Sequence, residues 1–172
     1  MKSFFAFFFL LLVSVRSDVI QESCDKAAKG DAGINYGFCV ASLEQNPKSK
    51  TATSIGDLVP ITIDIAISNA TSISSIISNL LKNKNLEHYT RMCLEDCSEL
   101  YSDVGSSLKS GRQAFMSKDY GSANADISAA LDAPDTCEDQ FKEKKGVVSP
   151  LTKENSNFSQ LTALSLAFIS ML

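Results

Sequence analysis

Five cysteines constrain the fold of this chain more tightly than any other feature of its sequence. They lie at positions 24, 39, 93, 97 and 137. An odd number leaves at least one cysteine unpaired within the chain, and counting alone leaves the connectivity open. The sharpest question concerns Cys93 and Cys97, which are four residues apart in RMCLEDCSELYSDV. Such a pair could belong to a metal site, a redox centre or a structural bridge with one free thiol.

Residues 1–17, MKSFFAFFFLLLVSVRS, have the layout of a signal peptide. Lys2 gives a positive start, Phe4 to Val13 form an apolar run, and cleavage is expected after Ser17. The alternative, a membrane anchor, needs roughly 20 apolar residues, about twice the length of this run. We therefore expect a secreted, extracellular protein that does not enter the membrane. In an oxidising compartment cysteines are interpreted first as disulfides.

Loss of the signal peptide removes two basic residues, Lys2 and Arg16, and no acidic one, so the net charge of −4 becomes −6. We expect one domain over residues 18–172, which is long enough to bury a core. An acidic chain does not suit nucleic acid as a partner, because phosphate binding needs a basic surface. The densest basic run, FKEKKG, includes Glu143 and is more typical of a solvated turn.

Hydrophobic spacing predicts an all-α fold. Residues 18–50 are short apolar pieces broken by glycines and Pro47, which suits short helices and turns held by cysteines. Residues 86–115, 117–132 and 153–172 carry apolar side chains at three- and four-residue spacing, and the second of these helices should stop near Pro134. With the Ile-rich stretch at 55–82, these segments predict a four-helix bundle.

The Ile-rich stretch, IGDLVPITIDIAISNATSISSIISNLLK, supports two periods. Alternation typical of a half-buried strand involves Ile61, Ile63, Ile65 and Ile67. The spacing of a bundle helix involves Ile63, Ala66, Ala70, Ile73, Ile77 and Leu80. The helical pattern runs more than twice as long, and Pro60 could sit in a first turn, so periodicity favours a helix without excluding a strand.

The apolar C-terminal stretch, KENSNFSQLTALSLAFISML, also has two interpretations. A hydrophobic tail can be a signal for a lipid anchor that is removed during processing. Polar residues nevertheless recur through it at a helical period: Ser159, Thr162, Ser165 and Ser170. A cleaved tail has no need of that pattern, so we favour a core helix.

The sequence contains no set of residues typical of catalysis. His88 is the only histidine, and it lies in a polar approach to a helix, where an exposed or capping role is expected. Phosphate-loop and dinucleotide patterns are absent, as are the Glu-x-x-His pairs of di-iron bundles. We therefore expect neither an enzyme nor a bound cofactor or metal.

Helix geometry argues against a disulfide between Cys93 and Cys97. Residues four apart on a helix have Cβ atoms about 5–6 Å from each other, whereas a disulfide needs roughly 3.5–4.5 Å. These two cysteines should therefore not bond to each other, and no second Cys or His pair completes a zinc site. Cys97 shares a face with apolar neighbours and Cys137 starts the other distant segment able to reach it, which would leave Cys24 and Cys39 to close a local loop.

Several motifs in order resemble the plant invertase and pectin methylesterase inhibitor family across the mature chain. They are the Cys24–Cys39 pair, DCxELYxD at 96–103, and SAAL followed by TCEDQF within 128–141. SKDYGSAN and FKEKKGVVSPLTKENSNFSQLTALSLA, at 141–167, resemble the pollen-allergen branch of that family. The resemblance implies an N-terminal helical hairpin over 18–50 and an up-down-up-down four-helix bundle over 51–172. It also implies disulfides Cys24–Cys39 and Cys97–Cys137, with Cys93 a buried free thiol.

The resemblance further implies a non-enzymatic protein that docks on the active-site cleft of a secreted plant enzyme in the apoplast or cell wall. The target would be invertase or, alternatively, pectin methylesterase, and a non-inhibitory pollen protein is the third possibility. Where the invertase inhibitors carry Pro-Lys-Phe, this sequence has Asp119, Tyr120, Gly121 and Ser122. We take these four residues as the candidate target interface of a monomer.

Two N-glycosylation sequons remain, Asn69-Ala70-Thr71 and Asn157-Phe158-Ser159. Both fall within predicted helices, whereas used sequons are expected in surface loops. Asn69 and Asn157 are therefore candidate modification sites only.

Overall fold

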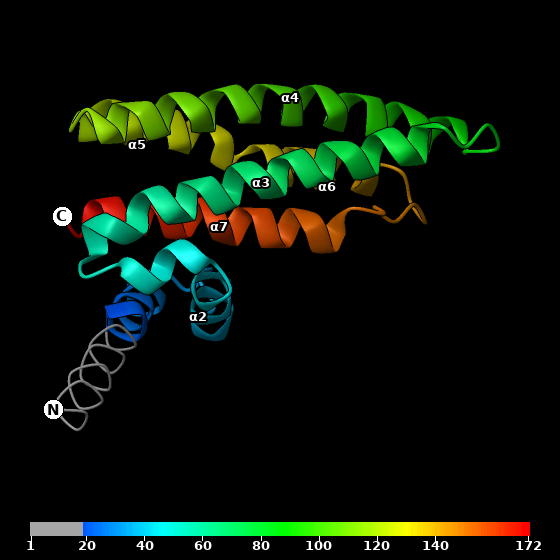
Figure 1. The fold of residues 1–172 in the computed structure, drawn as a ribbon. Coiled ribbons are helices and arrows are strands. Elements are labelled where there is room, and N and C mark those ends of the chain that lie inside the picture. Colours follow the sequence, from blue (N-terminus) through cyan, green and yellow to red (C-terminus); the bar gives the residue numbers. More distant parts are fainter. Residues whose placement is uncertain (1–18) are drawn as a thin grey trace, which may run out of the picture.

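The computed structural model describes residues 19–172, and every regular element in that range is a helix. The long helices lie side by side as rods, and a short helical hairpin packs beneath one end of them (Figure 1). The predicted signal peptide, residues 1–17, lies outside the described residues. The predicted all-α class is confirmed.

The rods form an up-down-up-down bundle. The first two are α3 (Ile55–Leu81) and α4 (His88–Met116), and the third is divided into α5 (Tyr120–Leu131) and α6 (Ala133–Lys142). The fourth, α7 (Thr152–Ser170), returns to the end where α3 began (Figure 1). α3 packs against α4 and α7, and α5 and α6 pack against the same two helices, so the four rods close around one core.

The Ile-rich stretch is the helix α3 and not a strand. Ser54 is its N-cap, and the Asp57 carboxylate accepts a hydrogen bond from the Ser54 backbone N–H at 3.0 Å, which completes a capping box. The apolar residues at three-four spacing are buried: Ile63, Ala66, Ala70, Ile73 and Ile77. Tertiary packing on both sides therefore decides between the two periods. The helix begins at Ile55, so Pro60 lies in the second turn and not in the first.

By length and composition, α3 could also span a membrane. In the structure, 39% of its most apolar window is buried inside the protein. The core helix of a water-soluble bundle has the same composition. Here the isoleucines Ile63, Ile73 and Ile77 are fully buried among the other helices. Ser68, Thr71 and Ser72 lie on the solvent side.

The helix before Pro134 stops close to it, as predicted, but the third rod continues beyond it. α5 ends at Leu131, and α6 begins two residues later with Pro134 in its first turn. Proline has no backbone N–H, but the N–H groups of a first turn have no partner within the helix, so none is lost there. Pro134 is itself buried. The third rod is thus continued by a second short helix, which carries Cys137 toward α4.

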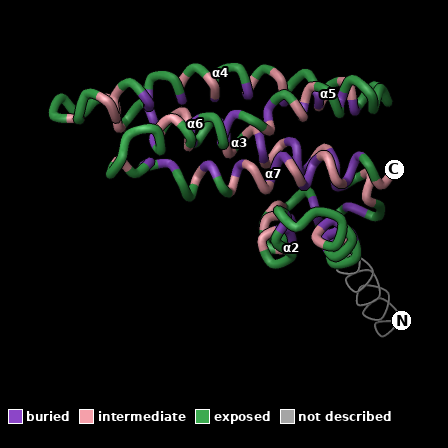
Figure 2. Tube along the Cα trace, turned by 180° about the vertical axis from the view of Figure 1, so that it is seen from behind, coloured by how far each residue is buried: buried purple, intermediate pink, exposed green. Residues whose placement is uncertain are grey.

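The N-terminal hairpin consists of a helix at 19–30, α2 (Tyr36–Glu44) and the short 3-10 helix η1 (Pro47–Thr51). A Cys24–Cys39 disulfide joins its two helices. The backbone N–H of Asn35 donates to Gln160 Oε1 on α7 at 3.1 Å, which fastens the hairpin to the bundle. Figure 2 shows that burial follows the inward faces of the rods, while the hairpin is exposed along most of its outer surface.

Candidate functional site

The predicted interface residues, 119–122, are the N-cap and the first residues of α5; with Ser117 and Lys118 they make up the α4–α5 turn. Lys118 has φ of 63°, the left-handed conformation that ends a helix, and its backbone N–H donates to the Phe115 carbonyl at 2.9 Å. Asp119 is the N-cap of α5 and accepts hydrogen bonds from Ser122 N at 3.1 Å and Ser122 Oγ at 2.7 Å. The backbone N–H bond, and then the hydroxyl bond, hold the pKa of the Asp119 carboxyl below its usual value. The turn is therefore a fixed structure.

Tyr120 is the largest side chain in this turn that remains accessible. It is 42% exposed, and its ring centroid lies 5.3 Å from that of Phe115, which is buried in α4. The contact fixes one side of the Tyr120 ring and leaves the other side in water. Met116, one turn earlier, is 59% exposed. Two large apolar side chains are thus exposed next to each other on the end of the bundle.

A groove of about 550 Å³ lies beside this turn. Three regions of the chain border it: η1 with the start of α3, the α4–α5 turn, and the C-terminal residue Leu172, which is 54% exposed. Its charged lining residues are Lys48, Asp57 and Lys118, and its apolar lining residues include Pro60 and Ile61. The groove therefore combines apolar and charged side chains, as protein-binding surfaces do. Sequence reasoning did not find Lys48, Met116 or Leu172, because these residues meet only in the folded bundle.

An ion-pair cluster braces one wall of this groove. Asp64 on α3 binds the Arg112 guanidinium on α4 through two hydrogen bonds, and Lys48 Nζ of η1 lies 2.9 Å from Asp64 Oδ2. Partial burial raises the pKa of Asp64, but the bonds to Arg112 and Lys48 outweigh that effect and the pKa is lowered. The cluster therefore stays charged at mildly acidic pH and links the hairpin to two bundle helices.

The groups that could carry chemistry do not gather in the groove. His88 is exposed at the first residue of α4, at the other end of the rod from Met116 (Figure 1). Within residues 19–172, no group of three or more His, Cys, Asp or Glu side chains is arranged to hold a metal ion. What the groove offers is shape, apolar area and charge, which are the means of binding another molecule.

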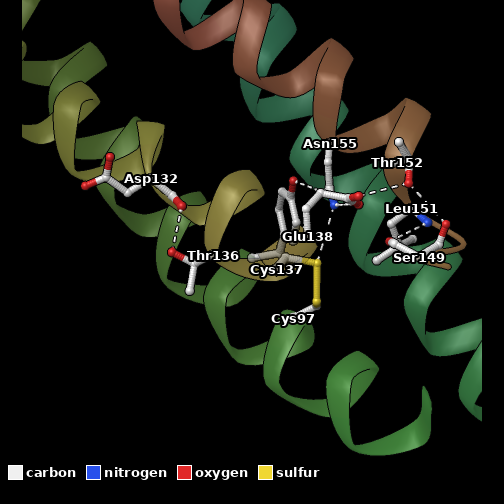
Figure 3. The surroundings of a disulfide bond; sticks show 10 residues. Cys97, Asp132, Thr136, Cys137, Glu138, Ser149, Leu151, Thr152 and Asn155 are labelled. Carbon is white, nitrogen blue, oxygen red and sulfur yellow. Dashed lines mark hydrogen bonds between the residues drawn. A yellow bond between two sulfur atoms is a disulfide. The ribbon is translucent and has the colours of Figure 1, made fainter. Parts of the chain in front are cut away.

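Cys97 and Cys137 form a disulfide between α4 and α6, and a buried polar network surrounds it (Figure 3). The centre of the network is Asn155 of α7, which is only 1% exposed. Its amide nitrogen donates to Glu138 Oε1 at 2.7 Å and to Cys137 Sγ at 3.4 Å, and its oxygen accepts from the Tyr101 hydroxyl at 2.7 Å. The disulfide therefore joins α4 and α6, and the hydrogen bonds of Asn155 connect α7 to both of them.

Cys93 is a free cysteine one helical turn before Cys97, and it is 3% exposed. Burial raises the pKa of its thiol, which outweighs the opposing hydrogen bond with Tyr89. A protonated, buried thiol is unreactive and packs as a small apolar group.

The two sequon asparagines lie on different helices that face the same side of the molecule. Asn69 belongs to α3 and Asn157 to α7, and both are half-buried. They border a groove of about 360 Å³ between the bundle and the N-terminal hairpin. The two asparagines are thus close together in space although far apart in sequence.

The fold defines a disulfide-linked helical bundle with a groove at one end. Residues 18–168 match the family described as "Plant invertase/pectin methylesterase inhibitor". The chain therefore belongs to the plant invertase/pectin methylesterase inhibitor family, whose members are enzyme inhibitors and not enzymes.

Curated relatives agree with this assignment. A candidate invertase inhibitor of Platanus acerifolia is 46% identical over 169 residues, covering 98% of this chain and 93% of its own. Pectinesterase inhibitor 12 of Arabidopsis thaliana is 38% identical over 154 residues, covering 90% and 87%. Among solved structures, a mutant form of a pectin methylesterase inhibitor from Arabidopsis superposes with a TM-score of 0.72 at 23% identity, covering 87% of this chain and 93% of that one. The last comparison shows the common fold alone.

Proposed function

We propose that this chain is a secreted inhibitor of a plant acid invertase of the cell wall. The observation that carries the proposal is the 46% identity, over 98% of the chain, to a candidate invertase inhibitor. A second Platanus protein of the same name, from Platanus orientalis, is 44% identical over 172 residues. Similarity over whole chains at this level favours the same class of target.

The α4–α5 turn and the groove beside it are the surface that we propose docks on the enzyme. Tyr120, Met116 and Leu172 are exposed there, and aromatic and Met side chains are enriched in the centres of protein interfaces. The turn is held by the Asp119 cap, and the bundle beneath it by a disulfide. A surface that is ordered before binding loses little conformational entropy when it docks, so more of the contact energy appears as affinity.

Pectin methylesterase is the second candidate target. Asp119, Tyr120, Gly121 and Ser122 stand where the invertase inhibitors of the family carry Pro-Lys-Phe. In addition, a pectinesterase inhibitor of Arabidopsis is 38% identical to this chain. Because of these two observations, the assay described next includes pectin methylesterase as well as invertase.

A direct assay separates the two targets. The chain without residues 1–17 is added to purified cell-wall invertase and, separately, to purified pectin methylesterase at mildly acidic pH. Dose-dependent loss of sucrose hydrolysis with unchanged demethylesterification supports the proposal. Inhibition of pectin methylesterase alone replaces it with the second candidate. Full activity of both enzymes in the presence of folded inhibitor overturns both and favours a non-inhibitory binding protein.

A further inference from the structure

The groove bordered by both sequons is formed where the N-terminal hairpin meets the bundle. Phe38 of α2 and Pro47 of η1 form the hairpin side, and Asn69, Asn157 and Leu161 are on the bundle side. Its volume is about 360 Å³, the volume that roughly a dozen water molecules occupy in liquid water. A single sugar ring with an acetamido group is of comparable size. The groove is thus suited to a compact, amphipathic occupant attached at its edge.

The amide nitrogen of Asn69 is available for such an attachment. Its oxygen is buried, and no donor among residues 19–172 reaches it, whereas its nitrogen is not among the buried unpaired atoms. The attachment atom therefore remains accessible, at a residue that lines the groove. Asn155 shows the contrast, because both ends of its amide are used in the buried network around the disulfide. The residue after next, Thr71, is exposed, and its hydroxyl bonds only to the helix backbone at Ile67.

Chain order favours Asn69 over Asn157 as a substrate. Asn69 lies in the first bundle helix, whose packing partners α4 and α7 come later in the chain. During synthesis it enters an oxidising lumen before those helices and before Cys137, so its sequon is still unpacked. Asn157 lies in the last helix and enters when the rest of the bundle is complete.

We propose that Asn69 carries an N-linked glycan whose first N-acetylglucosamine packs in this groove, between the hairpin and the bundle. The proposal rests on the secretion proposed above. The donor is a lipid-linked oligosaccharide diphosphate: Nδ2 forms a bond to C1 of the sugar, the bond from C1 to the diphosphate oxygen breaks, and one amide proton passes to a base. The apolar face of the ring then lies against Phe38 and Pro47, so the sugar braces the hairpin.

Peptide mass spectrometry tests the modification. The full chain, and residues 18–172 behind an established secretory leader, are produced in plant cells and digested before and after treatment with a glycopeptide amidase. Glycan mass on the Asn69 peptide, lost in Thr71→Ala and kept in Ser159→Ala, supports the proposal. A secreted, folded leader fusion with unmodified Asn69 overturns it. A glycosylated leader fusion together with a full chain that stays inside the cell supports the glycan and overturns the native secretion.

Hydrogen exchange tests the packing. Thr71→Ala removes the sequon and leaves the Asn69 side chain unchanged, so it isolates the effect of the sugar. Exchange of the backbone amides of α2 is expected to be about five-fold faster in Thr71→Ala than in the glycosylated chain, because the hairpin opens locally more often. In chains made without glycosylation, the same substitution should leave that exchange unchanged. Equal exchange in the glycosylated pair would overturn the role of the groove.

Discussion

The hydroxyl group of Tyr101 on α4 donates a 2.7 Å hydrogen bond to the side-chain oxygen of Asn155 on α7, 54 residues away. Both residues are buried, and the Tyr101 ring also packs edge-on against Phe158 with centroids 5.3 Å apart. The bond links the second and fourth rods beside the disulfide that links the second and third. It makes the bundle interior specific for one arrangement of its helices, because a displaced helix would leave buried polar atoms unpaired.

Tyr101→Phe is expected to lower the free energy of unfolding by about 1–3 kcal/mol. The ring contact with Phe158 stays, but the Asn155 oxygen loses its partner in a buried site, where an unpaired acceptor is costly. Urea denaturation followed by circular dichroism measures the change. Tyr36→Phe is the matched control, since Tyr36 is 44% exposed and should change stability by less than about 0.5 kcal/mol. Equal midpoints for the two variants would contradict the role of the bond.

Two glycines of α4 are expected to respond to alanine in opposite directions. A Cβ on Gly111 would lie 2.9 Å from Ile127 Cγ1 and 3.3 Å from the Ala123 carbonyl oxygen of α5, so Gly111→Ala should destabilise the protein by about 1–3 kcal/mol. Apart from its chain neighbours and the adjacent backbone of its own helix, Gly105 has no atom within 4 Å of that position. Gly105→Ala should therefore stabilise by roughly 0.5–1 kcal/mol through helix propensity. Thermal melting of both variants compares them, and a stabilising Gly111→Ala would show that the helices separate easily.

Asp57 is expected to make stability depend on pH. Its pKa is lowered mainly by the Thr53 backbone N–H and also by the bonds of the capping box, against a smaller opposing effect of burial. A carboxyl group whose folded pKa is lowered stabilises the protein above its unfolded pKa of about 3.9, and the effect is lost as pH falls through the folded value. Asp57→Asn should therefore reduce stability at pH 6 by about 0.5–2 kcal/mol, the usual worth of a cap.

The same substitution supplies its own control at low pH. As pH falls through the lowered folded pKa of Asp57 the wild-type carboxyl becomes protonated as well, so the difference between wild type and Asp57→Asn should shrink as pH falls below the unfolded pKa of about 3.9. Urea midpoints at several pH values measure this. A difference that is constant across that range would mean that the charge of Asp57 is not what stabilises α3.

Tyr120→Ala is expected to weaken inhibition of the target enzyme by about ten-fold or more while changing the melting temperature little. Tyr120 is exposed and rests on Phe115 from outside, so its removal takes away contact area for a partner and leaves the core intact. Inhibition constants and thermal melts are measured on the same preparations. Tyr36→Ala removes a tyrosine of similar exposure from the hairpin and should leave inhibition unchanged. A large fall in the melting temperature of Tyr120→Ala would identify Tyr120 as a structural residue.

The sequence determined the local elements of this protein because their signals are local. The three-four spacing of Ile63, Ala66, Ile73 and Ile77 needs only the period of a helix, and Asp119 caps α5 through contacts three residues apart. The resemblance to a known family added the order of the rods and the target class. The expected end of a helix near Pro134 is confirmed, because α5 ends at Leu131, but the sequence did not reveal that Pro134 lies in the first turn of a further helix, α6.

Only the tertiary structure decided which distant residues meet. Lys48, the pair Met116 and Tyr120, and Leu172 come from three regions of the chain and border one groove because the rods alternate in direction. Asn69 and Asn157, 88 positions apart in the numbering, face another groove for the same reason. Hydrophobic period sets which face of each helix is buried, but the packing of four such faces against one another sets their register. That register is a property of the assembled core, and no single segment carries it.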